Sequence, residues 1–587
     1  MGCCSSLSNC SLHSVAMTKT VSQFAEEVVH FSSQYGTDGN VSYVVPNLAG
    51  PSTIYPNYED VTAACVFRTY GSWWQQAPSA PCPIGRFHKK TFLGQDFVDL
   101  LYAEKVYPTE VRIYETYHPG AVVQIFACEL YMNQNGQMVN HDVRWQLLWS
   151  GEPQLSSDAR IFSPPLKKVK FAANLIRLVF HHLHLNYYTE LDAVELVGTV
   201  SEHDDGTDLD AVYASHLQAL SISPQDGTDV EVLSAGITTD NGYFDLLPGE
   251  LIQLIFGDLE LPDLCRVAAT CKLFKKHCYD QLLFLELDLQ PRWHMVNVRT
   301  LEGLKGRCEH LQKLSLSWCG DWEAITPEPF SRFISDCGAN LLCLRLAACV
   351  FLTAKNINVI ASTCQQLQEL DLSSVRILDS DAFDPLATLT NLTRLNLYRT
   401  RISEQVTIKI IRNSPKLEYI NLDAVQTIQN YDNVAAELAK CRNLLSVNLW
   451  RARTLTLTGL SILAKGCKDM LEIDLGWCVW LRSDGSNYHI ENFVQSCKKL
   501  RKLYLTALRS VSDSDLYAIA ANLPDLEQLD ILGTLAVGPM SVQRVLESCP
   551  KLRLFDLSFC NGVPEDAVRV WRETYPNVSI KRSFVSS

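Results

Sequence analysis

Leucine and isoleucine recur at nearly fixed spacing through the C-terminal half of the chain. The recurring unit is an L-x-x-L-x-L motif, and successive copies begin 25 to 30 residues apart. A period of this length accommodates one short strand and one helix per unit, and it predicts an α/β leucine-rich-repeat solenoid over residues 282–587. The copies begin at Leu311, Leu341, Leu367, Leu392, Leu417, Leu444, Met470, Leu500, Leu526 and Leu552.

The residues between the leucines of each predicted strand should face the concave side of the solenoid. Aromatic and arginine side chains gather at and beside these positions in the middle and later repeats, and such residues dominate interface energetics. Two longer repeats, around 321–330 and 483–489, are predicted to add binding loops. The predicted substrate-binding residues are Tyr398, Arg399, Trp450, Arg451, Asp474, Trp477 and Tyr504.

The N-terminal third has a different pattern. Short strand-like segments between residues 97 and 198 are separated by Pro, Gly and Asn clusters, which predicts an all-β antiparallel sandwich over 21–200. An apolar stripe over 24–31 predicts a short helix within it. Residues 201–240 hold nine acidic residues and no Lys or Arg, so they are predicted to form a disordered acidic linker. The small, polar residues 1–20 predict a disordered tail.

Cysteine usage and charge narrow the functional classes. Of the 21 cysteines, six lie three residues before a repeat motif and four lie three residues after one. This regular placement predicts buried, reduced thiols of a cytosol-facing protein rather than disulfides, and the absence of C-x-x-C argues against a zinc finger. A net charge of -14 disfavours nucleic-acid binding. The chain contains no run of eighteen apolar residues, so a membrane-spanning helix is not predicted.

A compact helical unit over residues 241–281 precedes the repeats. It matches L-P-x-E-L-x-x-x-I-F-x-x-L-x-x-x-D-L-x-x-x-x-x-x-C-K-x-F at twelve positions. An unrelated helical hairpin is the simpler explanation, but twelve matches directly before leucine-rich repeats disfavour it. The chain therefore resembles F-box proteins of the leucine-rich-repeat class. The matching residues are Leu247, Pro248, Glu250, Leu251, Ile255, Phe256, Leu259, Asp263, Leu264, Cys271, Lys272 and Phe274.

The resemblance implies a function. An F-box docks on Skp1 and, through it, on the cullin and RING subunits of an SCF ubiquitin ligase. The chain would then be a non-catalytic substrate receptor without a cofactor or a metal. The alternative is a membrane-associated scaffold whose F-box no longer engages a ligase. By the resemblance, the Skp1 contact is carried mainly by Pro248, Leu251, Ile255, Leu259 and Leu264.

Segments outside the F-box, such as FRTYGSWW at 67–74 and YYTELDAV at 187–194, also resemble this family. The resemblance implies a discoidin-like (galactose-binding-like) sandwich and a location on the cytosolic face of the mitochondrial outer membrane, with the nucleus and other membranes left open. There the family restrains mitophagy by directing mitophagy receptors to ubiquitination and degradation. Sugar binding by the sandwich alone is a third hypothesis.

The first residues suggest lipidation. Met1 to Ser6 fit the M-G-x-x-x-[ST] myristoylation pattern, and two cysteines follow the glycine. A six-residue pattern also arises by chance, but paired cysteines beside Gly2 favour acylation. One myristoyl chain binds membranes only weakly, so stable anchoring would need a second acyl chain. The predicted lipidation sites are Gly2, Cys3 and Cys4.

Overall fold

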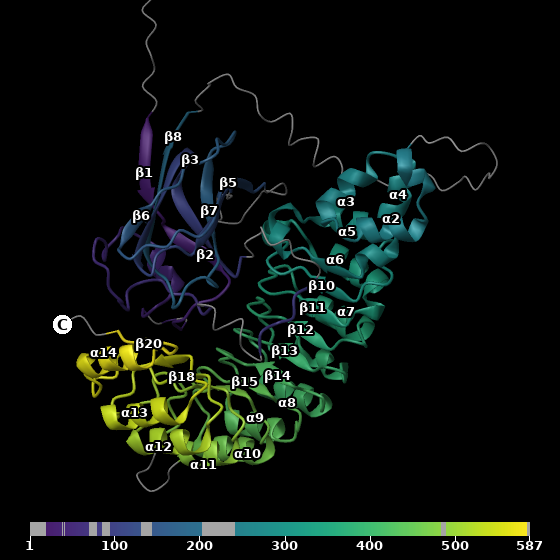
Figure 1. Cartoon of the computed structure of the whole chain (residues 1–587). Helices are drawn as coiled ribbons and strands as arrows, with labels where there is room; N and C mark the ends of the chain where they lie inside the picture. The colour runs from purple at the N-terminus through teal and green to yellow at the C-terminus, as the bar shows by residue number, and fades with distance from the viewer. Residues whose placement is uncertain are drawn as a thin grey trace, which may run out of the picture.

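The computed structural model describes residues 19–37, 39, 41–69, 79–84, 94–130, 144–201, 241–482 and 489–583. A curved solenoid runs from the helical unit at 249–278 to the C-terminus, and the N-terminal β domain sits inside the curve (Figure 1). The predicted tail up to residue 18, with Gly2, Cys3 and Cys4, and the predicted linker from residue 202 lie outside the described residues. Within the described part, no helix has the length and apolar character needed to span a membrane.

The N-terminal domain is built around one long strand that serves two antiparallel sheets. Strand β3 (Asp96–Tyr117) pairs with β7 (Ala173–Phe180) along its first half and with β8 (Glu190–Thr199) along its second. Both halves contribute to one hydrophobic cluster. The other strands are β1 (Thr20–Phe24), β2 (Glu27–Phe31), β4 (Val122–Cys128), β5 (Gln146–Ser150) and β6 (Arg160–Phe162), with a 3-10 turn η1 at Val45–Leu48.

The short helix predicted over 24–31 is wrong. This segment forms the end of β1 and all of β2, with β1 paired to β8 and β2 paired to β3. The apolar residues at 24, 28 and 31 fit a helical stripe, but the β-branched pair Val28-Val29 favours a strand. Pairing with distant strands decides the outcome, and a local pattern does not contain that information.

The helical unit consists of three short helices that join the solenoid without a break. Pro248 precedes α2 and Pro262 lies in the first turn of α3. Backbone N–H groups there have no partner within the helix, so a proline costs no hydrogen bond. The inward side chains of α2 belong to the same hydrophobic cluster as the repeats. The elements are η2 (Gly242–Leu246), α2 (Gly249–Phe256), α3 (Leu261–Ala268), α4 (Lys272–Cys278) and η3 (Gln281–Phe284).

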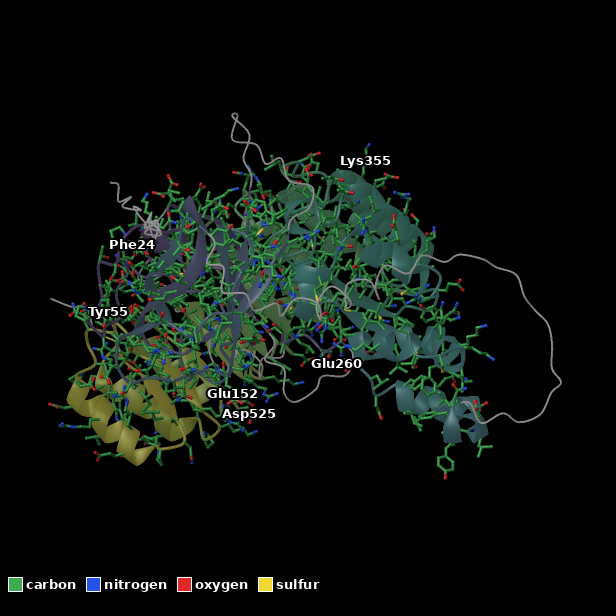
Figure 2. All side chains as sticks on the ribbon, turned by 90° about the horizontal axis from the view of Figure 1, so that it is seen from above. Phe24, Tyr55, Glu152, Glu260, Lys355 and Asp525 are labelled. Atoms are coloured by element: carbon green, nitrogen blue, oxygen red, sulfur yellow. The ribbon has the colours of Figure 1, made fainter. Side chains whose placement is uncertain are left out.

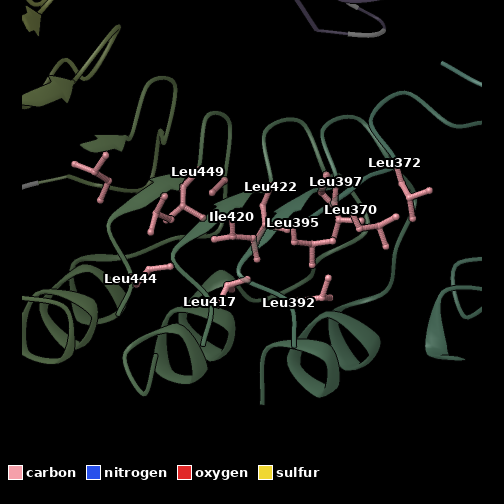
Figure 3. Packing of buried hydrophobic residues seen from close by; sticks show 14 of the residues in the cluster. Leu370, Leu372, Leu392, Leu395, Leu397, Leu417, Ile420, Leu422, Leu444 and Leu449 are labelled. Atoms are coloured by element: carbon pink, nitrogen blue, oxygen red, sulfur yellow. The ribbon is translucent and has the colours of Figure 1, made fainter. Parts of the chain in front are cut away.

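The repeats stack into one parallel sheet of twelve strands, in the order β9 to β20, with the helices on the convex side. The motif leucines of neighbouring repeats stack on one another inside the solenoid, as Leu395 does beside Leu370 and Ile420 (Figure 3). The strands are β9 (Glu286–Asp288), β10 (Lys313–Ser315), β11 (Cys343–Arg345), β12 (Glu369–Asp371), β13 (Arg394–Asn396), β14 (Tyr419–Asn421), β15 (Ser446–Asn448), β16 (Glu472–Asp474), β17 (Lys502–Tyr504), β18 (Gln528–Asp530), β19 (Leu554–Asp556) and β20 (Ser579–Lys581). The α-helices are α5 (Val298–Leu304), α6 (Pro327–Cys337), α7 (Ala354–Thr363), α8 (Glu404–Asn413), α9 (Tyr431–Leu438), α10 (Leu457–Gly466), α11 (His489–Ser496), α12 (Asp513–Asn522), α13 (Pro539–Ser548) and α14 (Glu565–Thr574). Short 3-10 turns are η4 (Gln290–Met295), η5 (Asp321–Glu323), η6 (Gly338–Asn340) and η7 (Asp384–Thr388).

The repeat cysteines are buried and free, as the sequence predicts. Those after the motif donate a hydrogen bond to a backbone carbonyl of the preceding repeat, for example from Cys349 to Leu316 at 3.0 Å and from Cys478 to Leu449 at 3.1 Å. Burial raises the pKa of the Cys478 thiol well above its ordinary value, so it stays protonated. These thiols therefore act as small spacers that also satisfy backbone acceptors.

Candidate protein-binding surfaces

An apolar face is exposed on α2 of the helical unit at 249–278, the predicted F-box. Leu251 and Ile255 are each 45% exposed and Leu254 is 65% exposed. Positions i, i+3 and i+4 share one side of a helix, so the three form a continuous patch, with exposed Pro248 at its edge. Large apolar side chains grouped in this way on a soluble protein mark a contact site. Leu254 is not among the predicted Skp1-binding residues, although its helical spacing from Leu251 indicates that both lie on the same face.

Two of the predicted Skp1-binding residues lie elsewhere. Leu264 of α3 is only 5% exposed and belongs to the hydrophobic core shared with the solenoid, so its assignment to the contact surface is wrong. A short helix must bury its apolar stripe to stay folded, and Leu264 is part of that stripe. Leu259 is half-buried and packs against the same core. The exposed face therefore consists of α2 and the residue before it.

This unit stands apart from the β domain. Seen from above, Glu260 and the teal helices beside it lie away from Phe24 and Tyr55 of the sandwich (Figure 2), and Figure 1 shows α2 and α4 at the outer end of the solenoid. The F-box face is therefore accessible while the inside of the curve is filled.

The predicted substrate-binding aromatic residues are covered by the sandwich. Trp450 is 1% exposed, and its ring meets that of Tyr35 edge-on at 5.2 Å between centroids. The Tyr398 hydroxyl accepts a hydrogen bond from the backbone N–H of Gln34 at 3.2 Å. Tyr504 is buried and donates to Gln528 within the solenoid at 2.6 Å. The prediction that these residues form an open concave surface is wrong, because a domain of the same chain fills the space.

The predicted charged residues of the concave face also contact the sandwich. Arg68 donates to Asp423 at 3.0 Å and to Asp474, and its guanidinium lies 4.0 Å from the centre of the Trp450 ring. Arg399 lies 4.1 Å from the centre of the Phe31 ring, and Arg451 is nearly buried beside Trp450. Burial raises the pKa of Asp474 to about 6, although Arg68 opposes the shift. These groups act in domain docking.

A second buried cluster ties the sandwich to the first longer repeat. Arg177 of β7 donates to both oxygens of Asp99, at 2.5 and 2.6 Å, and to Asp321 of η5. Burial raises the pKa of Asp321, but the charges of His30 and Arg177 outweigh it and lower this pKa to about 2. His30, Asp99 and Asp321 lie close enough to hold a metal ion. Because Arg177 already supplies the positive charge there, the cluster is an ion-pair network.

The docking hydrogen bonds allow a mild test. Replacing Tyr398 with Phe removes the acceptor for the Gln34 N–H, which should weaken docking by about 1 kcal/mol. Hydrogen exchange at the Gln34 amide should then accelerate about fivefold, measured by mass spectrometry or NMR. Tyr504→Phe, which loses a bond inside the solenoid, is the matched control and should leave this amide unchanged. Equal exchange in the Tyr398→Phe protein would show that this contact does not hold the domains together.

Trp477 is the exception among the predicted residues, because 38% of it remains exposed. It lines a hollow of about 780 Å³ between the sandwich and the later repeats. Trp73 and Trp74 of the sandwich, and most of the longer loop at 483–489, lie outside the described residues. Among the described residues, the accessible candidate surfaces therefore include the F-box face and this hollow.

Known proteins resemble this chain over the helical unit and over nearly its full length. An F-box-like family model matches residues 244–290. F-box/LRR-repeat protein 4 of Bos taurus is 42% identical over 574 residues, which covers 96% of this chain and 92% of that protein. Among solved structures, a chain of the Rad7 and Elc1 complex of yeast is similar over 64% of this chain and 98% of that chain. The sequence identity is 16% and the TM-score is 0.42. An internalin from Listeria monocytogenes is similar over 57% of this chain and 98% of that chain, with 14% sequence identity and a TM-score of 0.32. With 42% identity over nearly the full length of both proteins, the chain belongs to the F-box/LRR-repeat protein 4 family.

Proposed function

We propose that this chain is the substrate-recognition subunit of an SCF-type ubiquitin ligase. The observation that carries the proposal is the exposed apolar face of α2, which lies within the matched F-box segment and projects from the end of the solenoid. An apolar face of this kind is stabilised when a partner covers it. Skp1 is the partner that the F-box pattern implies.

The proposed mechanism is proximity without chemistry on this chain. The F-box fixes one end of the solenoid to the ligase, while the rest of the chain holds a substrate near the ubiquitin-charged enzyme. Holding two reactants together raises their effective concentration and removes much of the entropic cost of their encounter. The rigid junction of F-box and repeats, which share one hydrophobic core, would keep that distance fixed.

The substrates we propose are mitophagy receptors of the mitochondrial outer membrane, a proposal supported by the family resemblance. The same resemblance supports a cytosol-facing location at that membrane and a discoidin-like architecture for the sandwich. Skp1 is cytosolic, so a body anchored on the cytosolic side meets both ligase and substrate.

The test is to purify the full chain from cells and to assay Skp1, cullin and RING subunits in the same sample. Loss of the chain should lengthen the half-lives of mitophagy receptors, and inhibition of cullin activation should produce the same lengthening without an additive effect. Absence of Skp1 from the purified protein, with the F-box intact, would favour the scaffold alternative.

Membrane anchoring through the N-terminus is a further part of the proposal. Gly2→Ala removes the myristoylation site and with it the transient membrane visits that palmitoylation requires, so the protein should move to the soluble fraction. Cys10→Ser, outside the pattern, is the control and should leave sedimentation unchanged. A Gly2→Ala protein that sediments with membranes like its parent would place the anchor in a protein partner.

A further inference from the structure

One structural position recurs in every full repeat, and its surroundings differ between the first six repeats and the last four. The residue two places after the last motif leucine has a left-handed backbone with φ between 55° and 74° in ten successive repeats. In the first six repeats this position is buried or half-buried, and sandwich residues contact several of its side chains, as where Phe97 packs on Trp318 with ring centroids 5.0 Å apart. In the last four repeats it lines the hollow. The ten residues are Trp318, Ala348, Ser374, Arg399, Ala424, Arg451, Trp477, Ala507, Gly533 and Phe559.

The last four of these residues form the floor of the hollow. Backbone hydrogen bonds hold them in register, with the Trp477 N–H bonded to Thr506 at 2.9 Å and the Ala507 N–H to Leu532 at 2.7 Å. Neighbouring strands lie about 4.8 Å apart, so three steps span roughly 14 Å. Two small residues, Ala507 and Gly533, lie between the large Trp477 and Phe559. Their missing side-chain volume creates the depression.

The facing wall comes from the sandwich and consists mainly of three tyrosine side chains, with one valine and one threonine. The hydroxyls of Tyr43 and Tyr188 both donate to Asp60, which lies outside the lining. Because these hydroxyls bond to a residue outside the lining, the aromatic rings of Tyr43 and Tyr188 are the part that lines the hollow. Because both domains contribute, the hollow exists only while the sandwich is docked. Tyr35 joins this wall and also packs on Trp450, which links the hollow to the docking contacts.

The charge of the hollow contrasts with that of the whole chain. Arg482 and Arg509 stand exposed at its rim, and no carboxylate occurs among the described residues that line it. The chain as a whole carries a net charge of -14. A positive rim around an apolar floor is complementary to a ligand with acidic and apolar side chains, and arginine binds carboxylates well.

We propose that this hollow is the substrate-recognition groove and that it binds a short extended peptide with alternating acidic and apolar or aromatic residues. The inference rests on the proposed function, because it names the substrate segment that the ligase subunit would hold. A floor of roughly 14 Å matches about four residues of extended chain at 3.3 Å per residue. The volume of about 780 Å³ lies within the range of ligand pockets. The docked sandwich is thereby half of the receptor.

The sharpest variant fills the hollow from its floor. Ala507→Trp places an indole between Trp477 and Phe559, and those two residues show that large side chains are compatible with the same left-handed backbone, at φ 58° and 59°. Arg482→Glu with Arg509→Glu is an independent second variant on exposed residues, so it tests the proposal even if the first variant folds poorly. Arg569→Glu, exposed on α14, is the control for charge reversal.

The probe is a phage-displayed library of random dodecapeptides, selected on the full chain in complex with Skp1. Selected peptides should be rich in Asp and Glu beside Phe, Tyr, Trp or Leu. Their affinity should fall about tenfold or more in Ala507→Trp and in the double charge reversal, and stay unchanged in Arg569→Glu.

Several outcomes would overturn the groove assignment. These are selection of basic peptides, failure to enrich any acidic-apolar sequence, or equal binding to both groove variants. A dimer of the parent chain that Ala507→Trp dissociates would assign the hollow to a second copy instead. Skp1 retention is measured in the same samples. Loss of peptide binding with Skp1 bound therefore concerns the groove, whereas loss of Skp1 from the parent chain concerns the proposed function itself.

Discussion

Replacing Arg177 with Met is expected to release the sandwich from the solenoid. The guanidinium lies buried between Asp99 and Asp321, and it stacks on the rings of Phe97 and Trp293, 4.1 and 3.8 Å from their centres. Methionine fills similar space but removes the guanidinium that both buried carboxylates contact. Breaking a buried ion pair from one side typically costs about 3–5 kcal/mol. Denaturant titration followed by tryptophan fluorescence should therefore show an early transition for domain release.

Two comparisons isolate the cause. Arg569→Met removes an arginine from the exposed pair with Asp566 and should leave unfolding unchanged, because exposed pairs contribute little. Adding Asp99→Asn and Asp321→Asn to Arg177→Met removes the uncompensated charges and should restore part of the lost stability. A single Arg177→Met variant that unfolds like its parent would contradict the assignment of this cluster to docking.

Replacing Leu251 and Ile255 together with Asp is expected to abolish Skp1 binding. Both side chains are exposed on α2, so the fold should tolerate the change. Burying an ionised carboxylate in an apolar interface costs several kcal/mol unless it is paired. A loss of about 3 kcal/mol already lowers affinity more than a hundredfold, which calorimetry with purified Skp1 would measure.

The matched control carries the same chemical change at exposed apolar residues far from the F-box. Leu378→Asp with Val570→Asp meets this condition and should bind Skp1 like the parent. Leu254→Asp alone should weaken binding, since Leu254 is the most exposed residue of the patch. Undiminished Skp1 affinity in the Leu251 and Ile255 double variant would move the contact to another face of the unit.

Elements with strong local patterns could be predicted from the sequence. The motif leucines fix the repeat strands because the same spacing is repeated ten times, and the cysteines beside them are buried as their placement indicates. The F-box helices follow from proline positions and apolar spacing. The sequence did not reveal that Leu264 faces inward, because a helix of eight residues leaves little periodicity from which to choose its buried side.

The covering of the concave face could not be predicted, because it depends on contacts between residues far apart in the chain. Arg68 and Asp474 are separated by 406 positions, and nothing local in either segment indicates their pairing. One signal was present: an acidic residue recurs at the same strand position in several repeats, which is costly unless cations neutralise it. Asp371, Asp474, Asp530 and Asp556 hold this position, and Asp423 lies two residues after it in its own repeat. All five side chains are buried or half-buried.

The sandwich occupies the concave face of the solenoid and leaves the hollow and the F-box face exposed. Hydroxyl-radical footprinting of the intact chain tests this arrangement most directly, by comparing oxidation of Trp450 and Trp480. Trp450 is 1% exposed beneath the sandwich, whereas Trp480 is 56% exposed in the same region of the solenoid. The docked arrangement predicts strong oxidation of Trp480 and protection of Trp450 that is lost in Arg177→Met. Equal oxidation of the two tryptophans in the parent protein would contradict it.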